Sequence, residues 1–271
     1  MIKQAIIPLA GQGTRLLPLT SVFAKELLPI NGKPGIEYIL DECIEAGIKE
    51  VVFIISNKKK MIKNYFYSDT FYKKIIKKKK DPRIIAEYKK ILKYKKLIKF
   101  VYQNIPKGTG DAVFKTRKYI KDKYFLMLLP DDLIIKKNCS KDMIKVHQKH
   151  KSSVMASMKV NSKTVSRWGI YSLNKKISKN DYFIDGVVEK PSIKNAPSNK
   201  AVIGRYILPK TVFNKLAKQK PSKGGEIHIT DAIQTLIKEG EKFIAHNFSG
   251  KYLDCGTMQG FINSNNEIGK I

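Results

Sequence analysis

The chain has 271 residues, of which 42% are hydrophobic and 28% are charged, a composition that is ordinary for a folded protein. It contains no run of about 18 apolar residues, so we expect no membrane-spanning helix. The formal net charge of +30 would suit a protein that binds nucleic acid, but only 5 of the 53 basic residues are arginine. Because base- and phosphate-reading surfaces favour arginine, we expect no dedicated nucleic-acid partner.

The N-terminal residues lead directly from a short apolar strand into a glycine-rich loop, without the apolar region and cleavage site of a signal peptide. The three cysteines, Cys43, Cys139 and Cys255, are far apart and form no metal-binding spacing. An odd number of thiols fits a reducing compartment. We therefore expect a cytoplasmic protein.

The first half of the chain alternates between strand and helix patterns. The predicted strands are residues 3–9, 51–55, 98–102 and 124–129, and the predicted helices are residues 34–46 and 111–120. A stretch rich in lysine and tyrosine, residues 57–96, has weaker helical periodicity, and Asp81–Pro82 is expected to divide it into two helices. Such alternation is typical of an α/β domain with a mainly parallel sheet.

Strands become more frequent after about residue 150. The predicted strands there are residues 153–160, 168–173, 182–190 and 200–207, and the predicted helices are residues 210–218, 229–239 and 257–268. No internal repeat and no linker separates the two halves. We therefore expect one mixed α/β domain over residues 1–271.

A glycine-rich loop at residues 10–18, with the sequence AGQGTRLLP, follows the first predicted strand. Gly11 and Gly13 would allow a sharp turn whose amide groups could hold phosphate oxygens, and Arg15 adds a fixed cation. The loop is not a dinucleotide-binding fingerprint, because Leu16 stands where the third glycine is required. It is also not a P-loop, which needs Gly-Lys followed by serine or threonine. A plain glycine turn remains the alternative interpretation.

Polar side chains also follow two other predicted strands, at the edge where open α/β sheets bind ligands. Gln103 comes after the strand at 98–102, and its amide could read the edge of a nucleobase. Asp131 and Asp132 come after the strand at 124–129, where a Mg²⁺ ion would relieve the repulsion between the two carboxylates. The alternative for the acidic pair is a solvated turn.

Four further charged residues are candidates for binding. Lys25 in AKELLP would by itself be a surface residue, and its distance from the glycine loop makes it of interest. Glu189 and Lys190 end the strand predicted at 182–190, so their side chains should point to opposite sides, one toward sugar hydroxyls and one toward a phosphate. Asp254 in YLDCG is a second isolated acid near a glycine.

The order of these segments resembles the nucleoside-diphosphate-sugar pyrophosphorylases over nearly the whole chain. That family has a GxGTR loop, a KxxLP segment, an LxD metal segment and an EKP sugar segment, which stand here as GQGTRLLP, KELLP, LPDD and VEKP. The segments similar to the uridylyl-transferring branch of the family are GTGDAV, APSNKAVIGRY, EIHITDAI and DCG. Two positions depart from the family: Ala24 stands where proline is usual, and Trp168–Gly169 replaces Tyr-Gly.

The resemblance implies a fold and an activity. The fold would be a Rossmann-like, mixed and mainly parallel sheet flanked by helices, with a nucleotide-binding core over about residues 1–150 and a sugar-binding and C-terminal part over about 151–271. The activity would be transfer of the uridylyl group from UTP to glucose 1-phosphate with Mg²⁺, or the related reaction with dTTP or CTP. A homo-oligomer, either a dimer or a tetramer, is also implied.

The resemblance further implies a role for each matched residue. The residues implied at the nucleotide are Ala10, Gly11, Gly13, Gln103 and Gly108. Those implied to neutralise its phosphates are Arg15 and Lys25.

The remaining matched residues concern the metal and the sugar. Asp131, together with Asp254, would bind Mg²⁺. Gly169 and Glu189 would hold the hydroxyls of glucose, and Lys190 would bind the phosphate of glucose 1-phosphate. The catalytic group would then consist of Arg15, Lys25, Asp131 and Lys190.

Overall fold

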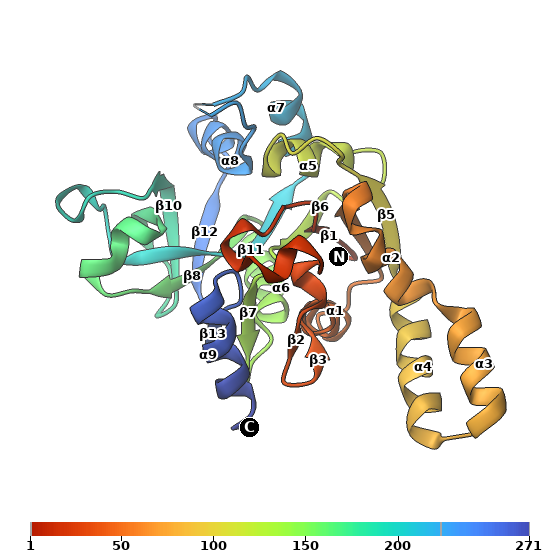
Figure 1. Cartoon of the computed structure of the whole chain (residues 1–271). Helices are drawn as coiled ribbons and strands as arrows, with labels where there is room; N and C mark the ends of the chain where they lie inside the picture. Colours follow the sequence, from red (N-terminus) through yellow and green to blue (C-terminus); the bar gives the residue numbers. More distant parts are fainter. Residues whose placement is uncertain (1, 223, 271) are drawn as a thin grey trace.

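A nine-stranded sheet runs through both halves of the chain in the computed structural model, which describes residues 2–222 and 224–270 (Figure 1). Residues 1, 223 and 271, which the expected domain over 1–271 also includes, lie outside the described residues. The first part of the sheet is formed by parallel strands in the order β5 (Ile98–Tyr102), β4 (Glu50–Ile55), β1 (Gln4–Pro8) and β6 (Tyr124–Leu128). All four correspond to predicted strands.

The second part of the sheet is mixed. In sheet order its strands are β11 (Lys200–Pro209), β8 (Ser153–Lys159), β12 (Phe243–Asn247), β10 (Asp181–Glu189) and β9 (Gly169–Lys176). Only β8 and β12 are parallel neighbours here, and β9 returns to pair with β11 at Ile170 and Ala201. The predicted mixed α/β class is confirmed, and its parallel character comes mainly from the first half of the chain.

The two larger hydrophobic cores of the described residues lie on opposite faces of the sheet. Alternate residues of β1 belong to different cores: Ala5 and Ile7 face one, and Ile6 faces the other. The first core is covered by α1 (Gly35–Glu45), α2 (Lys60–Tyr67), α4 (Pro82–Lys95) and α6 (Cys139–His150). The second is covered by α5 (Thr109–Lys115), α7 (Val212–Lys218) and α8 (Ile229–Lys238). Burial on both faces explains why the parallel strands are almost continuously apolar.

Residues 57–96 form three α-helices, not the two that the sequence predicted. The break at Asp81–Pro82 is confirmed, since α3 (Asp69–Lys79) ends before it and the Asp81 side chain caps α4 by accepting from the amide of Arg83 at 2.8 Å. The additional break is at Ser68, between α2 and α3. Helices α3 and α4 project away from the sheet (Figure 1). None of the described residues of α3 is buried, which explains its weak apolar periodicity.

Several elements were not predicted. Besides β12 and α6, these are the short antiparallel pair β2 (Pro29–Ile30) and β3 (Lys33–Pro34) and a second antiparallel pair, β7 (Asp132–Ile135) and β13 (Lys251–Asp254). Helix α9 (Met258–Ile268) matches the last predicted helix, whereas α5 ends at Lys115 and not at residue 120. The sheet of β7 and β13 brings the LPDD segment next to the DCG segment. Strands this short give little periodicity in a sequence.

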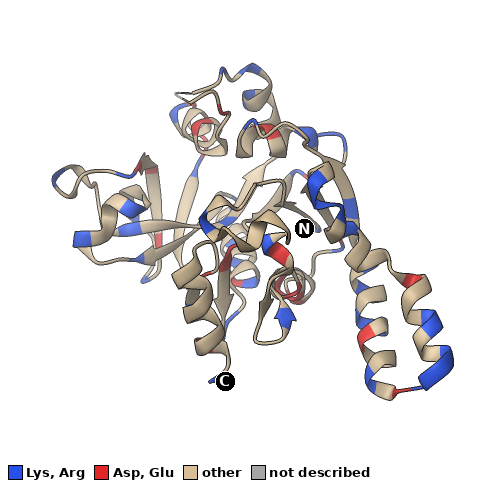
Figure 2. Cartoon of the chain, in the orientation of Figure 1, with Lys and Arg blue, Asp and Glu red and all other residues tan. Residues whose placement is uncertain are grey.

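Two further properties concern the whole molecule: the absence of a membrane-spanning helix among the described residues and the distribution of the basic residues. Among the described residues, no helix combines the length and the apolar character that crossing a bilayer requires. Lysine and arginine are spread over most elements, including α3 and α4 (Figure 2). The large positive charge is therefore spread over many elements and is not confined to one of them.

Candidate active site

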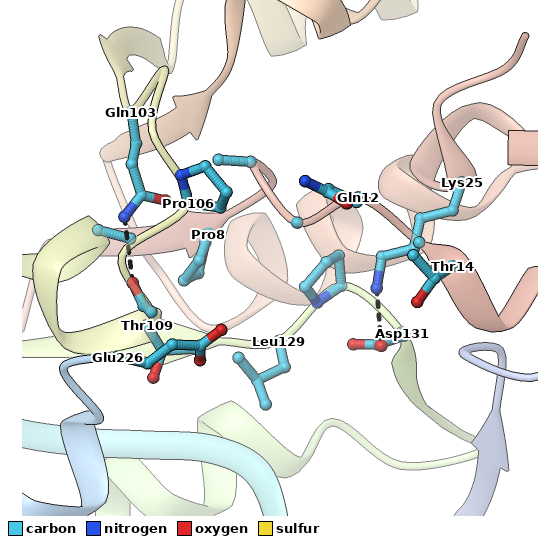
Figure 3. Close-up of a pocket in the computed structure, with 16 residues that line it drawn as sticks. Pro8, Gln12, Thr14, Lys25, Gln103, Pro106, Thr109, Leu129, Asp131 and Glu226 are labelled. Atoms are coloured by element: carbon cyan, nitrogen blue, oxygen red, sulfur yellow. Dashed lines mark hydrogen bonds and ion pairs between the residues drawn. The ribbon is translucent and has the colours of Figure 1, made fainter. Parts of the chain in front are cut away.

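A cavity of about 460 Å³ lies at the carboxyl ends of β1, β5 and β6 (Figure 3). This volume is within the range of small-molecule sites. Its walls come from three segments that follow these strands, at residues 8–14, 103–112 and 129–131, together with Lys25 and Glu226. The site therefore occupies the position that the open parallel part of an α/β sheet provides for ligands.

The glycine loop forms one wall of the cavity, and Ala10, Gly11 and Gly13 all line it. Gly13 has φ +71°, a left-handed conformation that favours glycine, and its carbonyl accepts a 2.8 Å hydrogen bond from the hydroxyl of Thr20. A Cβ added at Gly11 would meet no atom within 4 Å, so Gly11 leaves open space at the cavity. The loop can therefore bring its backbone close to a ligand.

Lys25 and Asp131 meet at the floor of the same cavity (Figure 3). The Nζ of Lys25 lies 2.7 Å from Oδ2 of Asp131, and Nη2 of Arg15 lies 3.4 Å from the same oxygen. Burial would raise the pKa of Asp131, but the charge and hydrogen bond of Lys25 outweigh burial and hold the pKa below its usual value. Likewise, burial would lower the pKa of Lys25, but Asp131 and Glu26 raise it. Both groups are therefore charged at neutral pH.

A buried ion pair supports the turn that carries Lys25. Both carboxylate oxygens of Glu26 accept from Nζ of Lys59 at 2.8 Å, and the two residues are only 3% and 8% exposed. The amide of Ala24, at the position where the family usually has proline, donates to Sδ of Met61 at 3.1 Å. Both contacts tie the turn at residues 24–26 to the start of α2. No feature of the lysine-rich sequence distinguished Lys59 from its neighbours.

The loop that carries Asp131 is held from behind by Arg205, which is fully buried. The guanidinium donates to the carbonyl of Leu129 at 3.2 Å and to that of Asp132 at 2.7 Å, on either side of Asp131. Its charge is balanced by Glu42, whose Oε2 lies 2.8 Å from Nη2. In the sequence, Arg205 stood out only as a member of the GRY segment, and no role was predicted for it.

The two aspartates of the acidic pair point to different partners. Asp132 accepts from the hydroxyl of Tyr252 at 2.7 Å and from the amide of Gly204 at 2.8 Å. Burial, reinforced by the charge of Asp131, raises the pKa of Asp132 to about 6. Asp131, which lines the cavity, is therefore the better placed of the two to meet a ligand.

Asp254 lies beside Asp131 because the chain after β13 returns to the LPDD segment. The amide of Cys255 donates to the carbonyl of Asp131 at 2.7 Å. The carboxylate of Asp254 accepts from the amide of Gly256 at 2.8 Å and from the hydroxyl of Thr257 at 3.2 Å. The two predicted metal ligands thus belong to adjoining segments.

The wall opposite the glycine loop contains Gln103 and Gly108. Gly108 has φ +92°, and a Cβ there would lie 2.5 Å from the carbonyl oxygen of Ile227, so no side chain fits. The amides of Gly110 and Ile227 pair this loop with the EIHITDAI segment through bonds of 2.7 Å and 2.9 Å. The same segment brings Glu226 into the cavity wall, a residue for which no sequence pattern predicted a role.

The three residues expected at the sugar form a separate cluster and are not among the cavity-lining residues. Glu189 and Gly169 are register partners in the β10–β9 pair, and a Cβ on Gly169 would lie 3.1 Å from Oε2 of Glu189. The amide of Lys190 donates to the carbonyl of Trp168 at 3.0 Å. The Trp168 ring contacts the Tyr252 ring at 5.8 Å between centroids, and the Tyr252 hydroxyl donates to Asp132, so this cluster adjoins the LPDD segment.

The prediction that Glu189 and Lys190 point to opposite sides is wrong in the described structure. Strand β10 ends at Glu189, and Lys190 has φ +45°, so the alternation of side chains along a strand no longer applies. Nζ of Lys190 lies 3.8 Å from Oε1 of Glu189, and both side chains are 65% exposed. The two charged groups therefore lie on the same side.

Comparisons with known proteins agree with this geometry over the whole chain. A family model described as nucleotidyl transferase matches residues 4–271. A putative UTP–glucose-1-phosphate uridylyltransferase of Methanocaldococcus jannaschii is 38% identical, covering 99% of this chain and 94% of the relative. UTP–glucose-1-phosphate uridylyltransferase 2 of Streptococcus pyogenes serotype M3 is 35% identical, covering 96% of this chain and 88% of the relative.

Solved structures are similar to the same extent. A crystal structure of UDP-glucose pyrophosphorylase complexed with UDP-glucose has a TM-score of 0.88 and 37% identity, covering 100% of this chain and 99% of the other. A UTP-bound UGPase from Acinetobacter baumannii has a TM-score of 0.91 and 30% identity, covering 99% and 94%.

Proposed function

The chain belongs to the nucleotidyl transferase family, and we propose that it transfers the uridylyl group from UTP to glucose 1-phosphate, giving UDP-glucose and pyrophosphate. The observation that carries this proposal is that Gln103, Lys25 and Asp131 face one cavity beside the glycine loop. A base-reading amide, a cation and a metal-binding carboxylate are the groups that a nucleotidyl transfer needs. The near-complete coverage of relatives whose names give this activity supports it.

For the nucleotide we propose the residues of the cavity. The backbone at Ala10, Gly11 and Gly13, with Gln103 and Gly108, would hold UTP. Arg15 and Lys25 would neutralise its phosphates, since both cations already lie within ion-pair distance of an acidic oxygen at the cavity floor. A preformed arrangement of cations costs no reorganisation when the phosphates arrive.

The chemistry proposed for these residues is positioning and charge neutralisation. An oxygen of glucose 1-phosphate attacks the α-phosphorus of UTP, and pyrophosphate leaves. The attacking phosphate oxygen is already ionised at neutral pH, so no general base is required. Because both reactants are anions, holding them in line and screening their repulsion supply most of the rate.

Members of this family generally use a divalent metal, and we propose Mg²⁺ held by Asp131 and Asp254. Their carboxylate oxygens are the ligands that Mg²⁺ prefers, and it usually takes one or two carboxylates together with phosphate oxygens. In the described ranges 2–222 and 224–270, no three His, Cys, Asp or Glu side chains gather to hold a metal, so the remaining ligands would be substrate and water oxygens. When bound, the ion supplies positive charge at the phosphates.

For glucose 1-phosphate we propose the second cluster. Gly169 and Glu189 would contact the hydroxyls, and Lys190 the phosphate. The exposure of Glu189 and Lys190 leaves both charged groups free to meet a ligand. In this proposal residues 1–150 bind the nucleotide and residues 151–271 bind the sugar, within one domain that shares the nine-stranded sheet.

The wider setting is also a proposal. We place the protein in the cytoplasm, where UTP is formed and where its three unpaired, buried cysteines would stay reduced. We also propose a homo-oligomer, a dimer or a tetramer, which light scattering combined with gel filtration would measure. No dedicated nucleic-acid partner is proposed.

The test of the proposed function is pyrophosphate release from UTP, dTTP, CTP and ATP, each with glucose 1-phosphate and Mg²⁺. We expect UTP to give the highest kcat/KM, with UDP-glucose as the sugar product. Higher kcat/KM with dTTP or CTP would assign the chain to a related sugar-1-phosphate nucleotidylyltransferase. No pyrophosphate release with any of the four nucleotides would refute the proposal.

A further inference from the structure

The amide of Gln103 is held on its donor side by two groups of the chain. Its Nε2 donates to the carbonyl oxygen of Gly108 at 3.1 Å and to Oδ2 of Asp111 at 2.7 Å. Gln103 is 5% exposed and lines the cavity, and Figure 3 draws a hydrogen bond from its amide nitrogen as a dashed line. Both hydrogens of the amide are therefore used inside the protein.

These two partners fix which way the amide is turned. A backbone carbonyl can only accept, and so can an ionised carboxylate. Nζ of Lys115 forms an ion pair with Oδ2 of Asp111 at 3.8 Å. If the Gln103 amide were reversed, its oxygen would face the oxygens of Gly108 and Asp111. The bond to Asp111 is the stronger of the two because its acceptor is charged.

The fixed orientation leaves the amide oxygen as the free group of Gln103. Within residues 2–222 and 224–270, no protein donor contacts this Oε1. The cavity wall at Gln103 therefore presents a hydrogen-bond acceptor. Uracil and thymine carry an N–H at position 3, which donates to such an acceptor, whereas the N3 atom of cytosine is itself an acceptor.

We propose that Asp111 determines base specificity by orienting Gln103, so that the nucleotide site accepts uracil and thymine and rejects cytosine. Asp111 is a positioning residue, because it acts through Gln103 and not on the nucleotide. The inference deepens the proposed function, on which it rests, by naming the chemical feature of the base that the site selects. With cytosine bound, the N3 acceptor of the base would face the Oε1 acceptor of Gln103. Two buried acceptors that face each other without a hydrogen bond give strong rejection of the wrong base.

The variant Asp111→Asn tests this directly. Its carboxamide has the size of the carboxylate, but it can present either an oxygen or an N–H to Gln103, so the reversed amide becomes accessible. Gly108 still favours the original orientation, and we therefore expect the ratio of kcat/KM for UTP to that for CTP to fall by roughly three- to tenfold. The ratio for UTP to dTTP should stay unchanged, because both bases carry the same N3–H.

The matched control is Lys115→Met, which removes the charge beside Asp111 and keeps the acceptor. It should retain the wild-type ratio of UTP to CTP. Titration calorimetry of UDP and CDP, without sugar phosphate, gives a second measure that does not depend on turnover. The preference for UDP over CDP should fall in Asp111→Asn by a factor similar to that for the triphosphates.

An unchanged preference for uracil over cytosine in Asp111→Asn would overturn the inference. An equal fall in the ratios of UTP to CTP and of UTP to dTTP would also overturn it, since uracil and thymine carry the same N3–H and the orientation of Gln103 cannot distinguish them. If Asp111→Asn does not fold, Asp111→Ser serves as the second variant, because a hydroxyl can also donate or accept. If the wild type forms no UDP-glucose, the proposed function fails, and the binding preference still decides the role of Asp111.

Discussion

Lys25 and Asp131, which are 106 positions apart in the chain, form a 2.7 Å ion pair at the floor of the cavity. Each residue neutralises the other in a partly buried place, with side chains 14% and 17% exposed. The same two residues are proposed to meet the phosphates and the metal. A cation and an anion that already face each other can exchange partners when charged ligands enter.

The first prediction concerns this carboxylate. Asp131→Asn keeps the size of the side chain and removes its charge, and we expect the rate of UDP-glucose formation to fall by about a hundredfold or more. The dependence of the rate on Mg²⁺ concentration should shift to higher concentrations. Steady-state rates measured over a Mg²⁺ titration provide the check.

Asp132→Asn is the matched control for that variant. Its amide can donate to the hydroxyl of Tyr252 while its oxygen accepts from the amide of Gly204, so both present contacts can be kept. It should retain more activity than Asp131→Asn. Near-normal Mg²⁺ dependence in Asp131→Asn would move the metal role to Asp132 or Asp254.

The second prediction separates the sugar site from the nucleotide site. Glu189→Gln keeps a hydrogen-bonding group but loses its charge, so we expect KM for glucose 1-phosphate to rise by about tenfold and discrimination among hexose phosphates to relax. Lys190→Met should impair use of glucose 1-phosphate more, because it leaves a phosphate charge without its partner. Kinetics with several hexose 1-phosphates would measure both effects.

Neither of these variants should change UTP affinity much. Calorimetric titration of UTP with Mg²⁺, in the absence of sugar phosphate, compares them with Arg15→Ala, which should bind UTP more weakly. If Glu189→Gln or Lys190→Met loses as much UTP affinity as Arg15→Ala, the VEKP segment belongs to the nucleotide site.

The third prediction concerns the stability of the loop that carries Asp131. Arg205→Met leaves Glu42 as a buried charge without its partner and removes the donors to the carbonyls of Leu129 and Asp132. We expect the free energy of unfolding to fall by about 3–5 kcal/mol. Urea denaturation followed by circular dichroism measures this loss.

The double variant Glu42→Gln with Arg205→Met is the control, because it leaves no unpaired buried charge at this position. It should lose less stability than the sum of the two single variants. Additive losses would mean that the pair contributes by packing and not by charge.

The fourth prediction is a pH dependence of stability. Burial lowers the pKa of His147, whose Nδ1 lies 2.8 Å from the carbonyl oxygen of Ser152. Because the unfolded histidine, with a pKa of about 6.5, binds its proton more readily than the folded one, stability is lost as the pH falls below that value. Between pH 7 and pH 5, the urea midpoint should fall further for the wild type than for His147→Gln. If the urea midpoints of the wild type and of His147→Gln fall equally between pH 7 and pH 5, His147 is not the source of this pH dependence.

The sequence by itself was sufficient for the fold class and for most of the residues that line the cavity. Near-continuous apolar strands alternating with helices predicted the parallel sheet, and polar residues after those strands predicted which edge carries the cavity. Gln103 and Asp131 lie there for this reason, because the carboxyl ends of parallel neighbours meet at one edge. These features depend on local periodicity and on the order of the strands, both of which are present in a single sequence.

Other parts of the site were decided only by the tertiary structure. Arg205 and Glu42 are 163 positions apart, and Lys59 and Glu26 are 33 apart, so nothing local marks them as partners. Lys190 leaves the strand in a left-handed conformation that the VEKP sequence does not indicate. Asp111 orients Gln103 because the loop after β5 turns into α5. Such contacts depend on how distant segments pack and on which buried charges need a counter-charge, and these conditions exist only once the chain has folded.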